Sequence, residues 1–206
     1  MRKLLVFLCA IALIFTIVGS ASAIPIEFGI DETKSSVELI IMTTWGICGS
    51  SSIYASLVDD LDTMENFSLY DGESLTFDFF DIIISDATGW LSGGTADVEA
   101  TLAFDSPVVS KVTDSGSGSW FTICGFISGG YLSWADMPQT LTLPDGNYFD
   151  VDFENVLIAG LGNTTTVSAT VTAHAAPVPE PATVMLLGTG LLGMIAFGRK
   201  RFNKKA

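Results

Sequence analysis

The side chains that could support chemistry in this chain are mainly carboxylates, because the 206 residues include 23 Asp and Glu but one His. One imidazole excludes the zinc sites that need two or three of them. His174 lies in Ala173–Pro177, which we predict to be a linker, so we expect a solvated rather than a catalytic histidine. No Gly-x-Ser-x-Gly sequence occurs either. We therefore predict that the protein is not an enzyme, although paired carboxylates leave glycoside hydrolysis open.

Four acidic residues form the densest group of potential metal ligands: Asp59, Asp60, Asp62 and Glu65. Carboxylate oxygens are the ligands that calcium prefers, but the spacing is not that of an EF-hand. The sequence leaves two interpretations open, a structural calcium site or an acidic exposed segment. We expect no other cofactor.

Cys48 and Cys124 each occur in an Ile-Cys-Gly context and are the two cysteines that follow the N-terminal apolar run. A pair of cysteines in an exported chain favours a disulfide. Such a bond would stabilise the fold by roughly 4 kcal/mol in the chain-entropy model. The alternative is two buried free thiols.

Aromatic side chains could form a platform for sugar binding, since a flat apolar ring can stack on a sugar. The candidates are Trp45, Trp90, Trp120, Trp134 and Tyr131. Trp90 and Trp134 stand near glycine-rich turns and are the ones we expect to be exposed. The alternative is that the rings fill the core, where large aromatics usually lie.

Charge and composition limit the class of protein. Hydrophobic residues make up 49% of the chain and charged residues 16%, which is unlike a disordered acidic polymer. Between Ile24 and Pro177 there are 22 acidic residues and two basic ones, Lys34 and Lys111, a net charge of about −20. A nucleic-acid-binding protein needs the opposite charge, so we exclude that class.

The residues between the two ends are predicted to form one all-β domain over 24–172, a β-sandwich or jelly roll, followed by a linker over 173–178. Nine segments are rich in β-branched and aromatic residues and are separated by turn signals. Gly93-Gly94, Asp114–Gly118 and Gly129-Gly130 are among the predicted turns. A short helix over Ser56–Phe67 competes with the second strand. The nine segments are Ser36–Met42, Ile53–Val58, Leu75–Ile84, Ala96–Phe104, Val108–Val112, Ser119–Ile127, Gln139–Leu143, Tyr148–Ile158 and Thr164–Thr172.

Two local patterns in these strands are specific. Pro144-Asp145-Gly146 predicts a tight turn inside a hairpin over Gln139–Phe153. After it, Phe149, Val151 and Phe153 alternate with acidic residues, so the rings and the carboxylates should face opposite ways. The alternation over Leu75–Phe79 loses its phase at Phe80-Asp81, which predicts a β-bulge or a strand end.

The N-terminus has the pattern of a cleaved signal peptide over 1–23. Arg2 and Lys3 precede an apolar run of 15 residues, Leu4–Val18, interrupted only by Thr16. Small residues at Ala21 and Ala23 then predict signal-peptidase cleavage after Ala23. An uncleaved anchor is the alternative, but the run is shorter than the ~20 residues of a spanning helix.

The C-terminus carries three features in a fixed order. Pro179, Glu180 and Pro181 come first, and the 17-residue apolar run 182–198 follows. A helix over that run would be about 25 Å long, enough for a thin bilayer. A basic tail over 199–205, beginning Arg199, Lys200 and Arg201, should stay in the cytoplasm.

This arrangement resembles the PEP-CTERM sorting signal of Gram-negative bacteria, and the resemblance is confined to Val178–Ala206 and the signal peptide. The resemblance implies that an exosortase processes the chain near Pro179–Pro181. It also implies a precursor anchored in the inner membrane and a mature protein that is released or transferred to the cell surface. A plain single-pass anchor would not explain the Pro-Glu-Pro sequence.

Together these patterns predict an exported structural protein of the cell surface or extracellular matrix, in the setting of exopolysaccharide and biofilm that the resemblance implies. The alternative function is a calcium-assisted module that binds extracellular polysaccharide. The expected partners are the exosortase, the inner membrane before processing and, in the alternative, exopolysaccharide.

Overall fold

The computed structural model describes residues 24–59, 61, 66–85, 87–161, 164–176 and 188–190. Contacts divide the chain into two compact units, residues 24–176 and the two ends, 1–23 with 177–206. In the second unit the description covers Gly188–Gly190, which are helical. Within the described ranges, no helix has the length and apolar character needed to cross a membrane.

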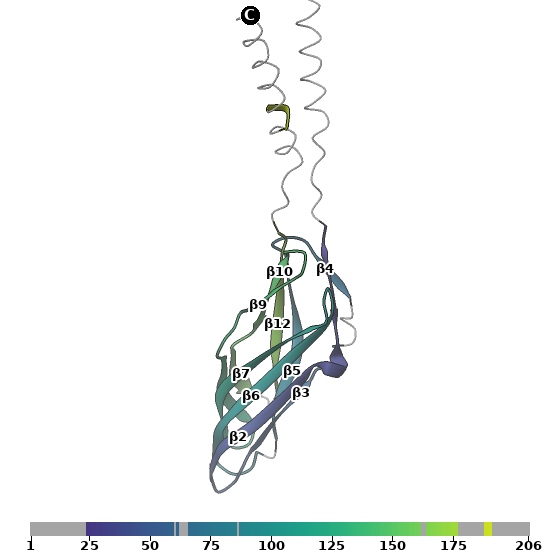
Figure 1. Cartoon of the computed structure of the whole chain (residues 1–206). Coiled ribbons are helices and arrows are strands. Elements are labelled where there is room, and N and C mark those ends of the chain that lie inside the picture. Colours follow the sequence, from purple (N-terminus) through teal and green to yellow (C-terminus); the bar gives the residue numbers. More distant parts are fainter. Residues whose placement is uncertain are drawn as a thin grey trace, which may run out of the picture. The chain divides into compact units, whose positions relative to one another are not determined.

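Residues 24–176 form twelve described strands and one short 3-10 helix, η1 (Figure 1). The first half holds β1 (Ile26–Ile30), η1 (Glu32–Lys34), β2 (Ser36–Ile47), β3 (Ser52–Leu57), β4 (Phe67–Leu69), β5 (Ser74–Ser85) and β6 (Leu91–Ser106). The second half holds β7 (Ser110–Ile123), β8 (Ile127–Trp134), β9 (Gln139–Thr142), β10 (Tyr148–Phe153), β11 (Val156–Leu161) and β12 (Thr164–His174).

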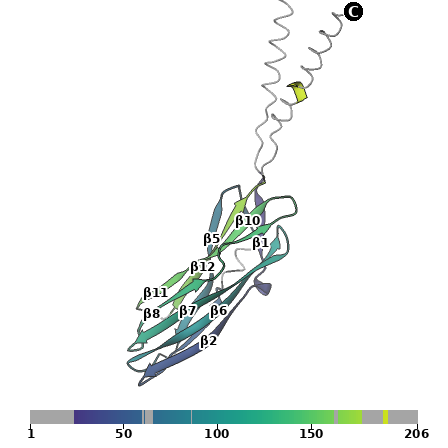
Figure 2. The ribbon, with the colours of Figure 1, turned by 60° about the vertical axis from the view of Figure 1, so that its left-hand side comes forward.

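The strands make two antiparallel sheets packed face to face, which confirms the predicted β-sandwich. The seven-stranded sheet has the order β11-β8-β7-β6-β1-β4, and β2 also pairs with β6. The five-stranded sheet has the order β3-β5-β12-β10-β9. Figure 2 shows β11, β8, β7, β6 and β2 side by side on one face of the domain. The β2–β6–β7–β8 region of this sheet carries the candidate site described below.

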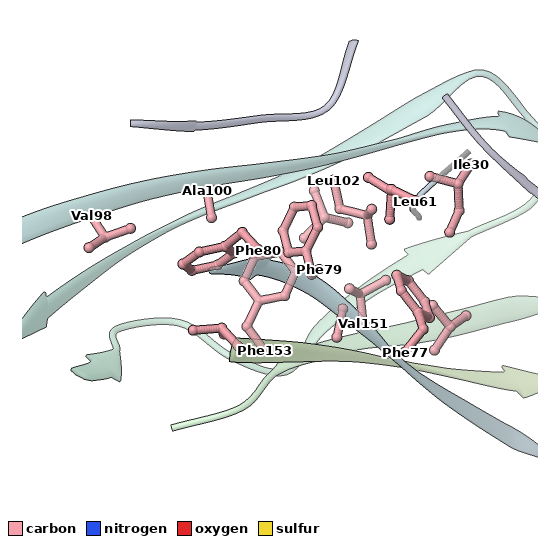
Figure 3. Packing of buried hydrophobic residues seen from close by; sticks show 14 of the residues in the cluster. Ile30, Leu61, Phe77, Phe79, Phe80, Val98, Ala100, Leu102, Val151 and Phe153 are labelled. Carbon is pink, nitrogen blue, oxygen red and sulfur yellow. The ribbon is translucent and has the colours of Figure 1, made fainter. Parts of the chain in front are cut away.

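The core lies between the sheets and is built by period-two alternation on both. On β10, Phe149, Val151 and Phe153 are buried, and the intervening residues are more exposed, as the sequence predicts. Val98, Ala100 and Leu102 of β6 point toward the side chains of β5 and β10 (Figure 3). Aromatic rings join the two sheets, with Phe149 in edge contact with Phe28 at 5.2 Å and with Phe104 at 5.3 Å between centroids. Large rings of this kind contribute most of the burial in such a core.

The irregularity predicted at Phe80-Asp81 is a β-bulge on β5. Phe80 pairs with Val167 and Asp78 with Ser168, so Phe79 is the extra residue. Both Phe79 and Phe80 are fully buried. The bulge lets two successive rings enter the core where strict alternation would expose one of them.

Three predicted turns are wrong because their small residues lie inside strands. Gly93-Gly94 belongs to β6, Asp114–Gly118 to β7 and Gly129-Gly130 to β8. Glycine is required at these positions because neighbouring atoms approach the backbone closely, not because the chain turns. A Cβ on Gly94 would lie 2.1 Å from the carbonyl oxygen of Thr43 and 2.6 Å from the Trp120 ring. Glycine within a strand commonly marks such an approach of backbone or ring.

Two predicted strands are each divided in the structure. Ser119–Ile127 turns between β7 and β8, and Tyr148–Ile158 breaks after Phe153 so that β10 and β11 join different sheets. The strand prediction for Ile53–Val58 is confirmed by β3. The rest of the competing helix, Ser56–Phe67, lies largely outside the described residues.

The connection from β1 to β2 closes a gap in the ladder along β6. Ile30 pairs with Phe104 and Ser36 with Thr101, so Ala103 lies between the two pairings. Its carbonyl accepts a hydrogen bond from the Asp31 N–H at 2.9 Å, and its own N–H donates to Ser35 Oγ at 3.0 Å. The Ser35 hydroxyl in turn donates to the Asp31 carbonyl at 2.9 Å. A buried backbone group is thereby satisfied where the two strands leave it unpaired.

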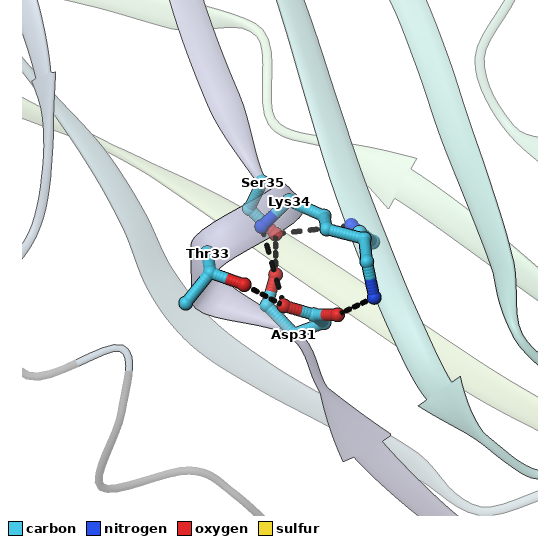
Figure 4. Close-up of polar contacts among 5 residues, drawn as sticks. Asp31, Thr33, Lys34 and Ser35 are labelled. Atoms are coloured by element: carbon cyan, nitrogen blue, oxygen red, sulfur yellow. Dashed lines mark hydrogen bonds and ion pairs between the residues drawn. The ribbon is translucent and has the colours of Figure 1, made fainter.

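The Asp31 carboxylate caps η1 on the exposed side of the same connection (Figure 4). It accepts hydrogen bonds from the Lys34 N–H at 3.2 Å and from the Thr33 hydroxyl at 2.6 Å, and it forms an ion pair with the Lys34 ammonium. These contacts, led by the hydrogen bond from Lys34, lower the pKa of Asp31 below its ordinary value of 3.8.

Replacing Ser35 by Ala should destabilise the domain by about 1–3 kcal/mol, because it leaves the buried N–H of Ala103 without a partner. Ser36→Ala is the matched control, since Ser36 is the next residue and is exposed. The free energy of unfolding in urea measures both. Equal effects of the two substitutions would contradict the role given to Ser35.

The stability that the Asp31 charge contributes should depend on pH. Its pKa is lowered in the folded state, so the contribution is complete above about pH 3.8 and is lost as the pH falls through the folded pKa. Asp31→Asn keeps a capping side chain but removes the charge. The variant should be less stable than the wild type near neutral pH and equally stable in strong acid, in paired urea titrations. A stability difference that grows on acidification would contradict this sign.

Candidate functional site

The outer face of the seven-stranded sheet carries a row in which aromatic residues alternate with glycines. Trp45 of β2 pairs with Gly93 of β6, Gly93 with Phe121 of β7, and Phe121 with Gly129 of β8. Directly opposed residues point to the same face of a sheet. A Cβ on Gly129 would lie 2.3 Å from the Phe121 ring, and a Cβ on Gly93 would lie 3.0 Å from the Trp45 ring. The two rings therefore lie over the glycines.

The aromatic row continues into a partly exposed apolar surface. The exposed fractions are 49% for Trp45, 40% for Phe121 and 54% for Tyr131. Tyr131 lies two residues beyond Gly129 on β8 and is opposed by Ser119, so it shares the face but covers no paired glycine. Ile47, Ile127 and Leu157 add exposed aliphatic side chains from β2, β8 and β11. We call this surface the aromatic face. It consists of Trp45, Ile47, Phe121, Ile127, Tyr131 and Leu157.

A polar hollow adjoins the aromatic face along the same strands. It has a volume of about 460 Å³. Its lining includes the carboxylates Asp97 and Glu99 and the hydroxyls Ser115, Ser117 and Ser133. Asp97 pairs with Ser117, and Ser117 with Ser133, so these polar groups form a row parallel to the aromatic one. None of the described residues lining the hollow is basic.

This arrangement combines two kinds of contact on one surface. Flat exposed rings offer apolar faces, and the adjacent carboxylates accept hydrogen bonds while the serine hydroxyls both donate and accept them. Ligand sites commonly combine an apolar lining with a few polar groups that orient the ligand. The surface is suited to a ligand with apolar faces and many hydroxyls, and unsuited to an anion.

The four tryptophans divide between the core and the surface. Trp120 is buried, and its indole N–H donates to Ser51 Oγ at 3.2 Å. Trp134 was expected to be exposed, but it packs against the core, and its indole N–H donates to the Glu154 carbonyl at 3.0 Å. Trp90 is 75% exposed, as predicted, where the chain enters β6.

His174 does not lie in a linker, because it is the last residue of β12. It pairs with Tyr148 on β10, and the two rings stack with centroids 4.5 Å apart. Its Nε2 is 3.1 Å from Asp150 Oδ2. The predicted linker thus began too early, since Ala173 is also in β12 and is fully buried. These contacts give His174 a structural position at the end of the five-stranded sheet.

The carboxylates give no described metal site. Asp59 is described, but Asp60, Asp62 and Glu65 lie outside the described residues, so the predicted calcium cluster stays a prediction. Elsewhere in the described part of the chain, no group of three or more His, Cys, Asp and Glu is placed to hold a metal ion.

One other carboxylate on the five-stranded sheet has a shifted pKa: burial raises the pKa of Asp152, on β10, above its ordinary value.

The predicted disulfide between Cys48 and Cys124 is wrong, since both are exposed free thiols in the structure. The reason is the strand between them. Ile47 and Ile123 pair with Leu91 from opposite sides, which separates β2 from β7 by two strand spacings, about 10 Å. A disulfide needs Cα atoms within about 7 Å.

Each cysteine instead makes a turn. Cys48 has φ 56° and Cys124 has φ 53°, in the left-handed region. Cys124 and Gly125, with φ 76°, are the central residues of the β7–β8 hairpin, closed by a hydrogen bond from the Phe126 N–H to the Ile123 carbonyl at 3.3 Å. Positive φ at both central positions defines a type I′ turn, which Asn-Gly usually forms. Because Cys-Gly is not a usual pair for this turn, the sequence did not predict it.

The predicted processing sites lie outside the described residues. This holds for Ala21 and Ala23, for Pro179, Glu180 and Pro181, and for the tail beginning Arg199, Lys200 and Arg201. The predicted helix over 182–198 is described only at 188–190.

A comparison with protein-family models matches residues 177–201 to the PEP-CTERM protein-sorting motif. This confirms the sorting signal expected from the Pro-Glu-Pro sequence, the apolar run and the basic tail. The motif implies an exported protein that an exosortase sorts to the cell surface. Searches of curated proteins and of solved structures gave no match.

Protein that lacks residues 1–23 should show two titratable thiols in the folded state, because Cys48 and Cys124 are exposed and separated by β6. Cys48→Ser should therefore lower the unfolding free energy far less than the roughly 4 kcal/mol expected for losing a disulfide. Thiol titration without reductant checks the first point and urea unfolding the second. If the folded protein has no titratable thiol, the prediction is contradicted and a Cys48–Cys124 disulfide is supported instead.

Proposed function

We propose that this chain is a non-enzymatic structural protein of the cell envelope or the exopolysaccharide and biofilm matrix, processed by an exosortase. The observation that carries the proposal is the PEP-CTERM motif over residues 177–201. In this proposal the signal peptide directs export and the apolar run 182–198 holds the precursor in the inner membrane. Cleavage near Pro179–Pro181 then yields the mature protein, either released or attached to the surface.

The end of the β-domain supports a cut at this place. The Ala175 N–H donates to Asp71 Oδ1 at 2.9 Å, and the Ala176 N–H donates to Asn147 Oδ1 at 2.7 Å. The domain therefore holds its chain by hydrogen bonds up to Ala176, three residues before Pro179. A cut near Pro179–Pro181 removes no residue of either sheet and leaves the domain intact.

The charge of the domain also supports a role in a hydrated matrix. Residues 24–177 carry a net charge of about −20 from 22 acidic and two basic residues. Charge of this size keeps a protein soluble and repels other anionic surfaces. Most of the described acidic residues are exposed or partly exposed, so their charges face solvent rather than the core.

A second candidate function is a module that binds extracellular polysaccharide, and the aromatic face favours it. Exposed rings that lie beside a hollow of carboxylates and hydroxyls are suited to sugars. The calcium-assisted version of this function depends on Asp59, Asp60, Asp62 and Glu65, most of which the structure does not describe. Melting temperatures compared at equal concentrations of calcium and magnesium would reveal a specific calcium site.

Replacing Pro179, Glu180 and Pro181 together by Ala should block processing while leaving export and folding unchanged. The physical reason is general: proline cannot continue a helix and biases the residue before it toward extended backbone, which is the form a protease binds. The variant should accumulate uncleaved in the inner membrane with its C-terminal segment retained. Fractionation and intact mass of the membrane and surface forms measure this outcome.

Pro177→Ala is the matched control, because it removes a neighbouring proline that is not part of the tripeptide. It should be processed normally. If the triple variant also reaches the surface at the normal rate, residues 179–181 do not direct processing, and the segment acts as an ordinary anchor.

A further inference from the structure

We infer that the aromatic face and the adjacent polar hollow together bind an uncharged polysaccharide chain, an inference that rests on the second candidate function above. The ligand lies across β2, β6, β7 and β8, with sugar rings on the aromatic side chains and sugar hydroxyls toward Asp97 and Glu99. The domain would thereby attach to a neutral glycan of the matrix without an enzymatic site.

The rings are placed to present their flat sides. Phe121 occupies the space that a side chain on Gly129 would fill, and Trp45 lies close to the corresponding space on Gly93. A ring held down on the backbone of the next strand turns one face outward. Trp45 and Phe121 are two strand spacings apart, about 10 Å, and Tyr131 lies in the next row on β8, two residues from Gly129. Three rings spread over two neighbouring rows suit an extended ligand rather than a single small molecule.

The polar row supplies the second half of the contact. Asp97 and Glu99 lie on β6 in the rows that follow Thr95, and Ser117 and Ser133 lie opposite and beyond them. Thr95 and Thr43 already share a hydrogen bond of 2.7 Å between their hydroxyls, at the border of the aromatic face. A glycan is a ligand that offers apolar ring faces and hydroxyls in alternation along its length.

The charge of the domain selects among the possible occupants. An anionic polysaccharide or a nucleic acid would meet Asp97 and Glu99 with no described basic residue in the hollow. A second copy of the chain would bring another charge of about −20 against this face. An uncharged glycan suffers neither repulsion, which makes it the occupant that the surface fits.

A substitution of Tyr131 can test ligand binding without removing a ring that protects the sheet. Trp45 and Phe121 cover glycines, so removing either exposes the backbone of a strand and weakens the sheet. Tyr131 is opposed by Ser119, and its ring is half exposed. Tyr54 of β3 is the matched control, because it is also a strand tyrosine, is 46% exposed, and belongs to the other sheet.

The experiment measures binding of the full chain, kept in a non-glycosidic detergent, to immobilised neutral glucan, mannan, xylan and galactan, with alginate as the anionic comparison. We expect at least one neutral glycan to bind and alginate not to bind. Tyr131→Ala should weaken that binding by about tenfold or more, and Tyr54→Ala should leave it unchanged. Asp97→Ala should also weaken binding, and Asp78→Ala, at an exposed acid of the other sheet, should not. Urea unfolding confirms that each variant is folded, and Tyr131→Gln replaces Tyr131→Ala if the latter is not.

The outcomes separate this inference from the proposed function. A wild-type chain that binds no neutral glycan overturns both the inference and the polysaccharide-binding candidate, while the sorting proposal is judged by the Pro179–Pro181 variant alone. If Tyr131→Ala and Tyr54→Ala bind the neutral glycan equally well, the aromatic face is not the binding surface and the inference is overturned. The polysaccharide-binding function itself would then remain a candidate. Preferential binding to alginate, or a dimer that Tyr131→Ala disperses, assigns the surface to another occupant and overturns the inference.

Discussion

The alternation of side chains along β6 is the constraint on which the rest of the domain depends. This 16-residue strand pairs with β7 on one side and with both β2 and β1 on the other. Its inward residues, such as Val98, Ala100 and Leu102, build the core, and its outward residues include Asp97 and Glu99 of the hollow. A shift of one residue would exchange these two sets, so the core fixes the register that creates the outer face.

The glycines of the seven-stranded sheet link its stability to its surface. Gly93 allows close approach of the β7 backbone and of the Trp45 ring, and Gly129 allows close approach of the Phe121 ring, so the two rings cover the backbone of these glycines. Cross-strand pairs of an aromatic residue with glycine are a known way to protect a weak strand position. The same packing that protects the sheet leaves Trp45 and Phe121 partly exposed, so the aromatic face arises from a structural need.

The chain separates its tasks by segment. All basic residues except Lys34 and Lys111 lie in the two ends, and the β-domain carries the negative charge. The domain completes its own hydrogen bonds by Ala176, and the PEP-CTERM motif begins at residue 177. Sorting and folding therefore use different residues, which is why changes in the tripeptide and changes in the core should have independent effects.

The sequence by itself determined the local features of this protein, because these depend on neighbours in the chain. Alternation over Phe149–Phe153 specified an amphipathic strand, and Pro144-Asp145-Gly146 specified a turn. The loss of alternation at Phe80-Asp81 predicted a bulge or a strand end, and the strand pairing shows the bulge. The sorting motif was likewise readable as a linear pattern. In each case the physical cause acts within a few residues.

Only the tertiary structure decided what depends on pairing between distant strands. The glycine pairs at 93–94 and 129–130 resemble turns in the sequence, and only their neighbours Thr43, Trp120 and Phe121 show that they are sites of close packing. The two cysteines appeared suited to a disulfide until β6 was found between them. The aromatic face joins residues from β2, β7 and β8, and the order of strands in a sheet is set by the burial of the whole core, which no local pattern contains.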